Sequence, residues 1–158
     1  MTVLGIDPGL AICGFGLLET RGREIAHIRH GAIRTKPGAA LKDRLLTIFD
    51  DLTELIAAFS PHEAVAEEMF FGKNAKTGLP VAHARGVALL ALAKAGLPVY
   101  EYKPAQIKQA VVGYGKAEKR QVMEMTRCLL KLPKIPRPDD AADALAAAIT
   151  HINMRGTR

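Results

Sequence analysis

The stretch that most constrains the fold is a short apolar run near the N-terminus that ends in an acidic turn. Residues Val3–Ile6 are followed by Asp7, Pro8 and Gly9. A short apolar segment closed by turn residues predicts a buried β-strand, so we expect Asp7 at the strand's end, beside the core but facing solvent. A carboxylate in such a place costs free energy unless a cation or a hydrogen-bond donor pairs with it. Asp-Pro-Gly is also a common turn sequence, so this residue alone does not distinguish a functional site from a capped turn.

A second acidic residue follows another short apolar run. Residues 64–66 are Ala-Val-Ala, and Glu67 comes directly after them. In an open α/β sheet, sites form at strand ends where the strand order changes direction. If the two predicted strands are neighbours at that point, the carboxylates of Asp7 and Glu67 converge.

Two further acids begin the last predicted helix, which starts near Asp139. Asp140 and Asp143 are three residues apart and therefore lie on one face of that helix. Acidic residues in a first turn also cap free N–H groups and complement the helix dipole, and Asp139 could serve that need unaided. The indication of function comes from the set, which is four acids from three separate segments, each at the end of an element.

Clustered carboxylates repel one another unless cations lie among them. Mg²⁺ takes oxygen ligands, keeps several waters and suits phosphate chemistry. Two such ions about 3.5–4 Å apart can activate an attacking water and stabilise a leaving oxygen. The sequence contains no Ser/His/Asp or Cys/His arrangement that would compete with this chemistry, and its five histidines form no ligand spacing.

The pattern along the chain predicts one domain, residues 1–158, with an α/β fold. Short turns join the first three predicted strands into an antiparallel meander, and helices then alternate with two more strands, which gives a five-stranded mixed sheet flanked by helices. Gly14 and Gly16 leave one face of the second strand nearly bare, which indicates a close approach by another segment. Residues 70–78 are expected to form a loop. The expected strands are 3–7, 12–18, 24–33, 64–66 and 99–102, and the expected helices are 41–59, 80–95, 104–112, 118–130 and 139 onwards.

The net charge of +6 is concentrated in one segment. Residues 101–137 hold nine basic and three acidic side chains, and a local excess of this size favours a polyanionic partner. No apolar run is long enough to cross a bilayer, and the N-terminus lacks a signal-peptide pattern. Cys13 and Cys128 form no CxxC pair, so a reducing cytoplasm is the expected location.

Six motifs, which together cover nearly the whole chain, resemble the RuvC family of Holliday junction resolvases. They are LGIDPG at 4–9, AEEMFFGKNA at 66–75, ARGVA at 84–88, VVGYGKAEKRQV at 111–122, LLKLP at 129–133 and DDAADALAAAITH at 139–151. The resemblance implies an RNase H-like fold, a homodimer, and Mg²⁺-dependent nicking of four-way DNA junctions during recombination and repair. It further implies two Mg²⁺ ions per site, with Mn²⁺ as a substitute, and a RuvA–RuvB branch-migration complex as partner.

The resemblance also assigns residues. The catalytic and metal-binding set is Asp7, Glu67, Asp140 and Asp143. The candidate DNA contacts are Phe70, Phe71, Lys73, Asn74, Lys108, Lys116 and Lys119. Of these, Phe70 matches the aromatic residue that contacts bases at the junction, and an exposed ring in this glycine-flanked loop could stack on an unpaired base.

Three other functions fit parts of the pattern. Actin-like and sugar-kinase ATPases also open with a hydrophobic strand and an Asp-x-Gly turn, but they need a second lobe for which 158 residues leave no room. A non-catalytic DNA-binding module would use the basic segment alone and would not need the strand-end acids. An RNase H-like nuclease acting on RNA, of the YqgF-like kind, remains open on patterning alone.

Overall fold

Five strands form one mixed sheet in the computed structural model, which describes residues 1–22, 24–69 and 75–155. The strand order is β3-β2-β1-β4-β5; the first three strands pair antiparallel, whereas β4 is parallel to both β1 and β5. The direction of the connections therefore changes between β1 and β4, as the sequence predicts. The bounds are β1 (Thr2–Asp7), β2 (Ile12–Arg21), β3 (Glu24–Arg34), β4 (Glu63–Glu67) and β5 (Val99–Tyr102).

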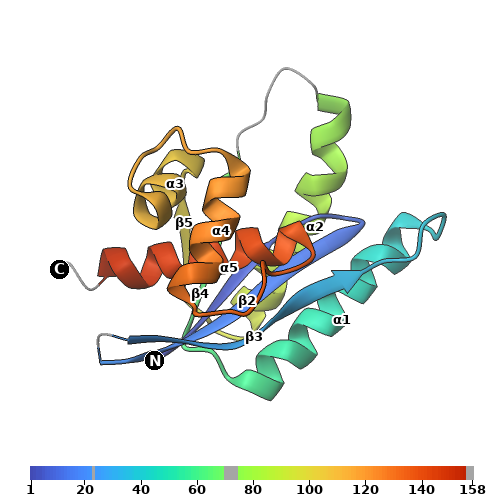
Figure 1. Ribbon diagram of the computed structural model, residues 1–158. Coiled ribbons are helices and arrows are strands. Elements are labelled where there is room, and N and C mark those ends of the chain that lie inside the picture. Colours follow the sequence, from blue (N-terminus) through green and yellow to red (C-terminus); the bar gives the residue numbers. More distant parts are fainter. Residues whose placement is uncertain (23, 70–74, 156–158) are drawn as a thin grey trace.

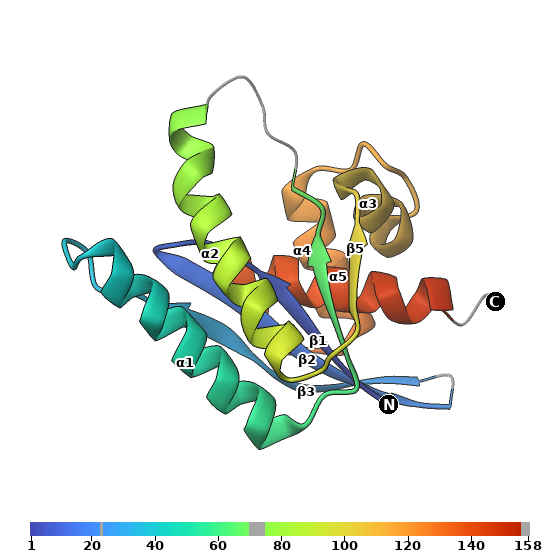
Figure 2. The same cartoon turned by 180° about the vertical axis from the view of Figure 1, so that it is seen from behind.

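Helices cover both faces of this sheet. In Figure 1, α3, α4 and α5 lie on the near face, and Figure 2 shows α1 and α2 on the opposite face. This confirms the expected five-stranded α/β architecture with flanking helices. None of the helices in the described ranges is long and apolar enough to cross a membrane. The bounds are α1 (Leu41–Phe59), α2 (Ala75–Lys94), α3 (Pro104–Val112), α4 (Lys119–Leu129) and α5 (Asp139–Arg155).

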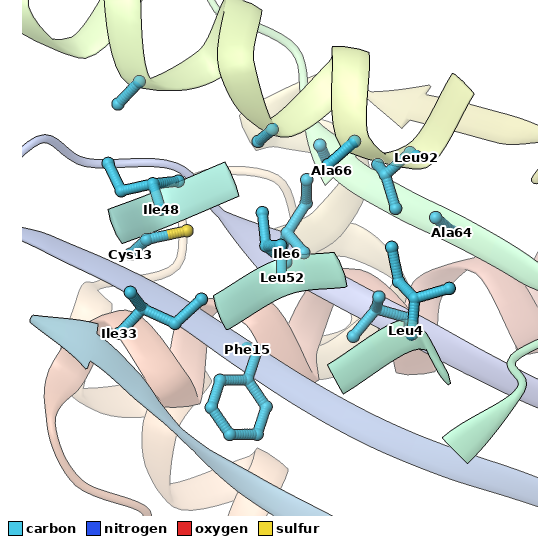
Figure 3. Packing of buried hydrophobic residues seen from close by; sticks show 14 of the residues in the cluster. Leu4, Ile6, Cys13, Phe15, Ile33, Ile48, Leu52, Ala64, Ala66 and Leu92 are labelled. Carbon is cyan, nitrogen blue, oxygen red and sulfur yellow. The ribbon is translucent and has the colours of Figure 1, made fainter. Parts of the chain in front are cut away.

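The central strands are buried on both faces, and their side chains alternate between two cores. Leu4 and Ile6 of β1 and Ala64 and Ala66 of β4 pack with α1 and α2, where Ile48 is fully buried (Figure 3). Each such buried Leu or Ile side chain contributes roughly 1.5–3 kcal/mol to folding. The intervening residues of β1 and β4 point to the other face and pack against α5. This alternation decides where the acidic ends of both strands point.

The last helix lies unusually close to the sheet because three strand positions facing it are glycine. A Cβ atom added at Gly5 or Gly14 would overlap the carbonyl groups of Ala144 or Asp140, and one added at Gly16 would meet the side chain of Leu145. The close approach expected at Gly14 and Gly16 is therefore confirmed, and α5 is the segment that makes it.

A buried polar network fixes the other half of α5. The Nε2 atom of His151 lies 2.7 Å from Oε2 of Glu63, and these side chains are only 2% and 8% exposed. The hydroxyl of Tyr102 lies 2.9 Å from His151 Nδ1, and Arg155 pairs with the second oxygen of Glu63. Burial lowers the pKa of His151, and a neutral ring that donates from Nε2 to the Glu63 carboxylate accepts from the Tyr102 hydroxyl at Nδ1. These contacts tie α5 to β4 and β5.

The start of α2 differs from the sequence prediction. The helix begins at Ala75, not at Pro80, so the expected loop 70–78 is wrong for residues 75–78. Proline is common in a first helical turn, but Pro80 lies inside this helix. Inside the helix, Pro80 removes one N–H donor to the carbonyl four residues earlier, and the helix continues on both sides of it.

Candidate active site

The ends of two neighbouring strands bring Asp7 and Glu67 together. In the parallel pairing of β1 and β4, Ile6 lies opposite Ala66, so the next residue of each strand is acidic. By the alternation of side chains, both carboxylates point to the sheet face that α5 covers. The predicted convergence of Asp7 and Glu67 is therefore present in the fold.

The first turn of α5 brings two more carboxylates to the same place. The helix begins directly over Gly14, which lies opposite Asp7 in the antiparallel pairing of β1 with β2. Asp140 and Asp143 are thereby brought near Asp7, and their charges act on its ionisation. The neighbouring Asp139 instead pairs with Arg137, outside this group.

The electrostatics of Asp7 show how closely these groups are coupled. Burial, followed by the negative charges of Asp143, Asp140 and Glu67, raises the pKa of Asp7 from 3.8 to about 7. An ordinary capped-turn aspartate would not show this, because hydrogen bonds to a carboxylate lower its pKa. Asp7 is thus held where a negative charge is costly in the absence of a cation.

The pKa values of two other acids in the group are raised as well. For Glu67 the main cause is burial, followed by the charge of Asp143, while Lys108 and Lys119 act in the opposite direction. For Asp143 burial is again the main cause, and the hydrogen bond from Lys119 opposes it. Perturbed carboxylates gathered at the ends of strands are typical of a functional site.

One cation already lies at the edge of the acidic group. Nζ of Lys119, at the start of α4, donates a hydrogen bond of 2.8 Å to Oδ2 of Asp143 and lies 4.0 Å from Asp139. Although partial burial acts against it, this hydrogen bond raises the pKa of Lys119. The acidic group therefore attracts positive charge from the chain itself.

The chemistry of the four acids fits a hard divalent cation, although their positions do not form a complete ligand set. All four offer carboxylate oxygens, the ligands that Mg²⁺ prefers. Within the described parts of the chain, no three His, Cys, Asp or Glu side chains lie close enough together to hold one ion. The fit is one of donor type and of charge, as the raised pKa of Asp7 indicates.

The predicted DNA contacts fall into two groups. Lys108 and Lys119 line a cavity of about 300 Å³ together with Glu67 and Asp143, so these two lysines lie beside the acids. Lys116 is exposed in the turn before α4. The other four candidates, Phe70, Phe71, Lys73 and Asn74, lie outside the described residues.

Arg85 lies in the ARGVA motif, and no local sequence pattern assigns it a role. A cavity of about 280 Å³ next to the acids is lined by Asp7, Glu67 and Arg85, among others. Nη1 of Arg85 donates a hydrogen bond of 2.9 Å to the main-chain oxygen of Glu67, and Nη2 pairs with the carboxylate of Glu101. The available signal was an arginine flanked by the small and apolar residues Ala84, Gly86 and Val87.

Comparison with known proteins gives a consistent result over almost the full length. Residues 3–151 match the family model described as crossover junction endodeoxyribonuclease RuvC. The chain is 56% identical over 149 residues to the protein of that name from Heliobacterium modesticaldum, covering 94% of this chain and 92% of the relative. It is 54% identical over 151 residues to that of Chloroflexus aggregans, covering 96% and 92%.

The fold agrees with a solved structure as well. Thermus thermophilus RuvC, solved in complex with a Holliday junction substrate, superposes with a TM-score of 0.93 at 37% sequence identity. The superposition covers 99% of this chain and 96% of that one. The five-stranded sheet and its helices are therefore those of the RNase H-like fold seen in that protein.

Proposed function

Because the chain belongs to the RuvC family of crossover junction endodeoxyribonucleases, we propose that it cuts four-way DNA junctions by paired nicks in strands of like polarity. It acts as a metal-dependent endonuclease in recombination and DNA repair, within a single nuclease domain. The observation that carries this proposal is the gathering of four acids at the ends of β1 and β4 and the start of α5, beside two lysines.

The proposed catalytic residues are the four acids, which would hold the metal through their carboxylate oxygens. We propose Mg²⁺, two ions per site, with Mn²⁺ as a substitute. When bound, such ions activate the attacking water and stabilise the leaving oxygen. Lys119 donates a hydrogen bond to Asp143, so its positive charge would reduce the repulsion between the acids and an approaching phosphate.

The proposed function is tested by cleavage of three substrates with and without Mg²⁺. They are a synthetic four-way junction, its linear duplex arms and an RNA–DNA hybrid. We expect cleavage of the junction alone, and only with metal. Cleavage of the hybrid in preference to the junction would indicate an RNA-directed nuclease, and junction binding without cleavage would indicate a non-catalytic module.

DNA binding is assigned to the basic surface around α3 and α4. Lys108 and Lys119 lie at the acidic group, and Lys116 extends the positive surface into the preceding turn. A lysine next to a scissile phosphate both neutralises its charge and releases condensed counterions. Phe70, Phe71, Lys73 and Asn74 remain proposed contacts to unpaired or backbone groups at the junction.

Junction affinity should fall steeply with salt, and removal of a contacting lysine should flatten that dependence. For Lys108→Ala and for Lys119→Ala, we expect the log–log slope to decrease in magnitude by about 0.9 each, the value for one phosphate contact on duplex. The measurement is a salt titration of binding in metal-free buffer. Arg21→Ala is the matched control, because Arg21 lies at the opposite end of β2, paired with Glu19. Unchanged slopes in both lysine variants would place the DNA on another surface.

We also propose that the working unit is a homodimer, because two nicks of like polarity need two acidic groups related by a two-fold axis. We expect the helix of residues 80–95 to provide the interface, because its apolar side chains lie on more than one face. Ala84 and Ala88 are fully buried against the protein's own core, so they cannot take part in a close helix contact between subunits. Among the described residues, the exposed large apolar side chains of α2 are Leu79 and Leu90, each 59% exposed, and Val81, 37% exposed, and they are available for that contact.

A dimer with one inactive subunit tests whether each of the two nicks is made by a different subunit. We expect a mixed dimer of wild-type and Asp7→Asn chains to nick one strand of a cruciform plasmid and to leave the other intact, because each acidic group serves one strand. The measurement is the ratio of nicked to linear plasmid under single-turnover conditions. Linear product formed by the mixed dimer within one binding event would refute one active site per subunit.

A RuvA–RuvB complex is the further partner that we propose from the family resemblance. Addition of that complex to the cleavage assay should change the rate or the position of cutting. Cleavage that is identical with and without it would remove this partner from the reaction in solution.

A further inference from the structure

The carbonyl group at the end of β4 lacks the hydrogen bond that a continued sheet would give it. In a parallel ladder, successive residues of a strand bond alternately to the two neighbouring strands. The N–H groups of Ala64 and Glu68 donate to Pro98 and Tyr102 on the β5 side, at 2.9 and 2.8 Å. Residues 64 and 68 therefore bond toward β5. Glu67 is the residue before Glu68, so its carbonyl group faces the other neighbour, β1.

Its donor on β1 is missing for a reason that the sequence shows. The pairing places Ile6 opposite Ala66. Continued by one residue, it would direct the N–H of residue 8 to the oxygen of Glu67. Residue 8 is Pro8, which has no N–H. A main-chain oxygen this close to the core needs another partner.

Arg85 of α2 supplies that donor. Its Nη1 lies 2.9 Å from the Glu67 oxygen, and the contact closes a segment of 18 residues between the two. The Arg85 side chain is only 14% exposed, and its Nη2 is held by the carboxylate of Glu101 on β5. The guanidinium is thus fixed from two sides and is not free to follow a passing phosphate.

The contact acts on the direction of the Glu67 side chain. The peptide unit after Glu67 is held at both ends, by Arg85 on its C=O group and by Tyr102 on the N–H group of Glu68. Fixing this plane fixes ψ of Glu67, and with it the direction of the Cα–Cβ bond. Without Arg85, the plane is held at one end only, at the residue where regular β structure stops.

We propose that Arg85 is a positioning residue for Glu67, replacing the sheet hydrogen bond that Pro8 cannot make. This inference rests on the proposed role of Glu67 in the metal-dependent site. It gives the arginine of the ARGVA motif a function distinct from DNA contact. A phosphate-binding arginine and a positioning arginine differ in what their removal changes.

The first test compares Arg85→Gln with wild type. We expect the turnover of junction cleavage to fall about 10–100-fold, as for other groups that orient a metal ligand. The apparent affinity of the free protein for Mn²⁺, measured by electron paramagnetic resonance without DNA, should weaken about tenfold. Junction binding without metal and its salt slope should stay within twofold of wild type, as in the matched charge-loss control Arg21→Gln.

The second test asks whether Arg85 and Pro8 act on the same carbonyl. Pro8→Ala restores an N–H group at the ladder position. In a double-mutant cycle, Arg85→Gln should therefore cost less turnover in the Pro8→Ala background than in wild type, by about threefold or more. Arg85→Lys, which keeps one charged donor, should retain intermediate turnover, and Glu101→Gln should retain most of it.

Three results would overturn the proposal while leaving the proposed function intact, provided that wild type cleaves. One is wild-type turnover and Mn²⁺ affinity in Arg85→Gln. Another is a loss confined to junction affinity with a flatter salt slope, which would make Arg85 a phosphate contact. The third is a loss that parallels a lower melting temperature, disappears on cooling and is the same in both Pro8 backgrounds. Failure of wild type to cleave would instead overturn the function itself.

Discussion

Replacement of Asp7 by asparagine is expected to abolish cleavage of a four-way junction and to leave its binding nearly intact. Asp7 lies at the centre of the acidic group, where the charges of Asp143, Asp140 and Glu67 all reach it. Loss of one metal-holding carboxylate removes several kcal/mol of transition-state stabilisation, about 10³-fold or more in rate. We expect binding to depend on the basic surface, and one negative charge fewer should slightly tighten it in metal-free buffer.

The same substitution has a second, independent readout in the stability of the protein without DNA. The pKa of Asp7 is raised to about 7 in the folded state, so the folded protein binds more protons than the unfolded chain between about pH 4 and 7. Its stability therefore falls as pH rises through this window. At pH 8 without metal, Asp7→Asn should melt at a higher temperature than wild type.

Added Mg²⁺ should raise the melting temperature of wild type more than that of Asp7→Asn, because a ligand that binds the folded state stabilises it. Gel shifts without metal, cleavage assays with Mg²⁺ and thermal melts at pH 5 and 8 together test the role of Asp7 in cleavage and in metal binding. Near-wild-type cleavage by Asp7→Asn would remove Asp7 from the mechanism. A melting temperature of wild type that is independent of pH and Mg²⁺ would contradict the electrostatic account.

Gly14→Ala is expected to damage both the fold and the site. The new methyl group would overlap the carbonyl of Asp140 and lie 2.8 Å from the main-chain nitrogen of Ala141. These are backbone atoms of the first turn of α5, so they cannot turn aside as a side chain could. Overpacking of this kind costs roughly 1–3 kcal/mol or more, which lowers the melting temperature of a chain of this size by roughly 2–12 °C.

The functional consequence should exceed the loss of stability. Displacement of the first turn moves Asp140 and Asp143 away from Asp7, so cleavage should fall about 10²-fold even well below the melting temperature, as for misplacements of about 1 Å. Gly31→Ala on β3 is the matched control, because the three atoms nearest to its new methyl group all belong to the ring of Phe15, the closest at 3.0 Å. Gly14→Ala that melts and cleaves as wild type does would refute the close packing of α5 on β2.

Much of the architecture was predictable because it depends on local patterns. The structure reproduces within a residue or two the elements that were indicated by the apolar spacing in residues 41–59, the proline at the start of α3 and the acids in the first turn of α5. The prediction was wrong at the start of α2, which was expected at Pro80 and lies at Ala75. The sequence around a proline does not show whether the rest of the helix compensates for the main-chain hydrogen bond that the proline removes.

The acids of the candidate site could be predicted from the sequence, but the contacts that hold them in place could not. Asp7 and Glu67 could be recognised because each follows a short apolar strand, and alternation then directs both to one face. The position of Lys119 on Asp143, and the bond from Arg85 to the carbonyl of Glu67, join segments 24 and 18 residues apart. Such contacts depend on how helices pack on the sheet, and no local pattern records them.

The sequence by itself thus determined which residues carry charge at the ends of buried strands, and where the chain leaves room for close packing. Gly14 and Gly16 indicated that some segment would lie against β2, because only a bare backbone allows it. Only the tertiary structure decided that this segment is α5, and that its first turn places Asp140 and Asp143 over Asp7. The pKa of Asp7 depends on burial and on charges from three other segments. These contributions exist only when the folded chain excludes water and brings the carboxylates together.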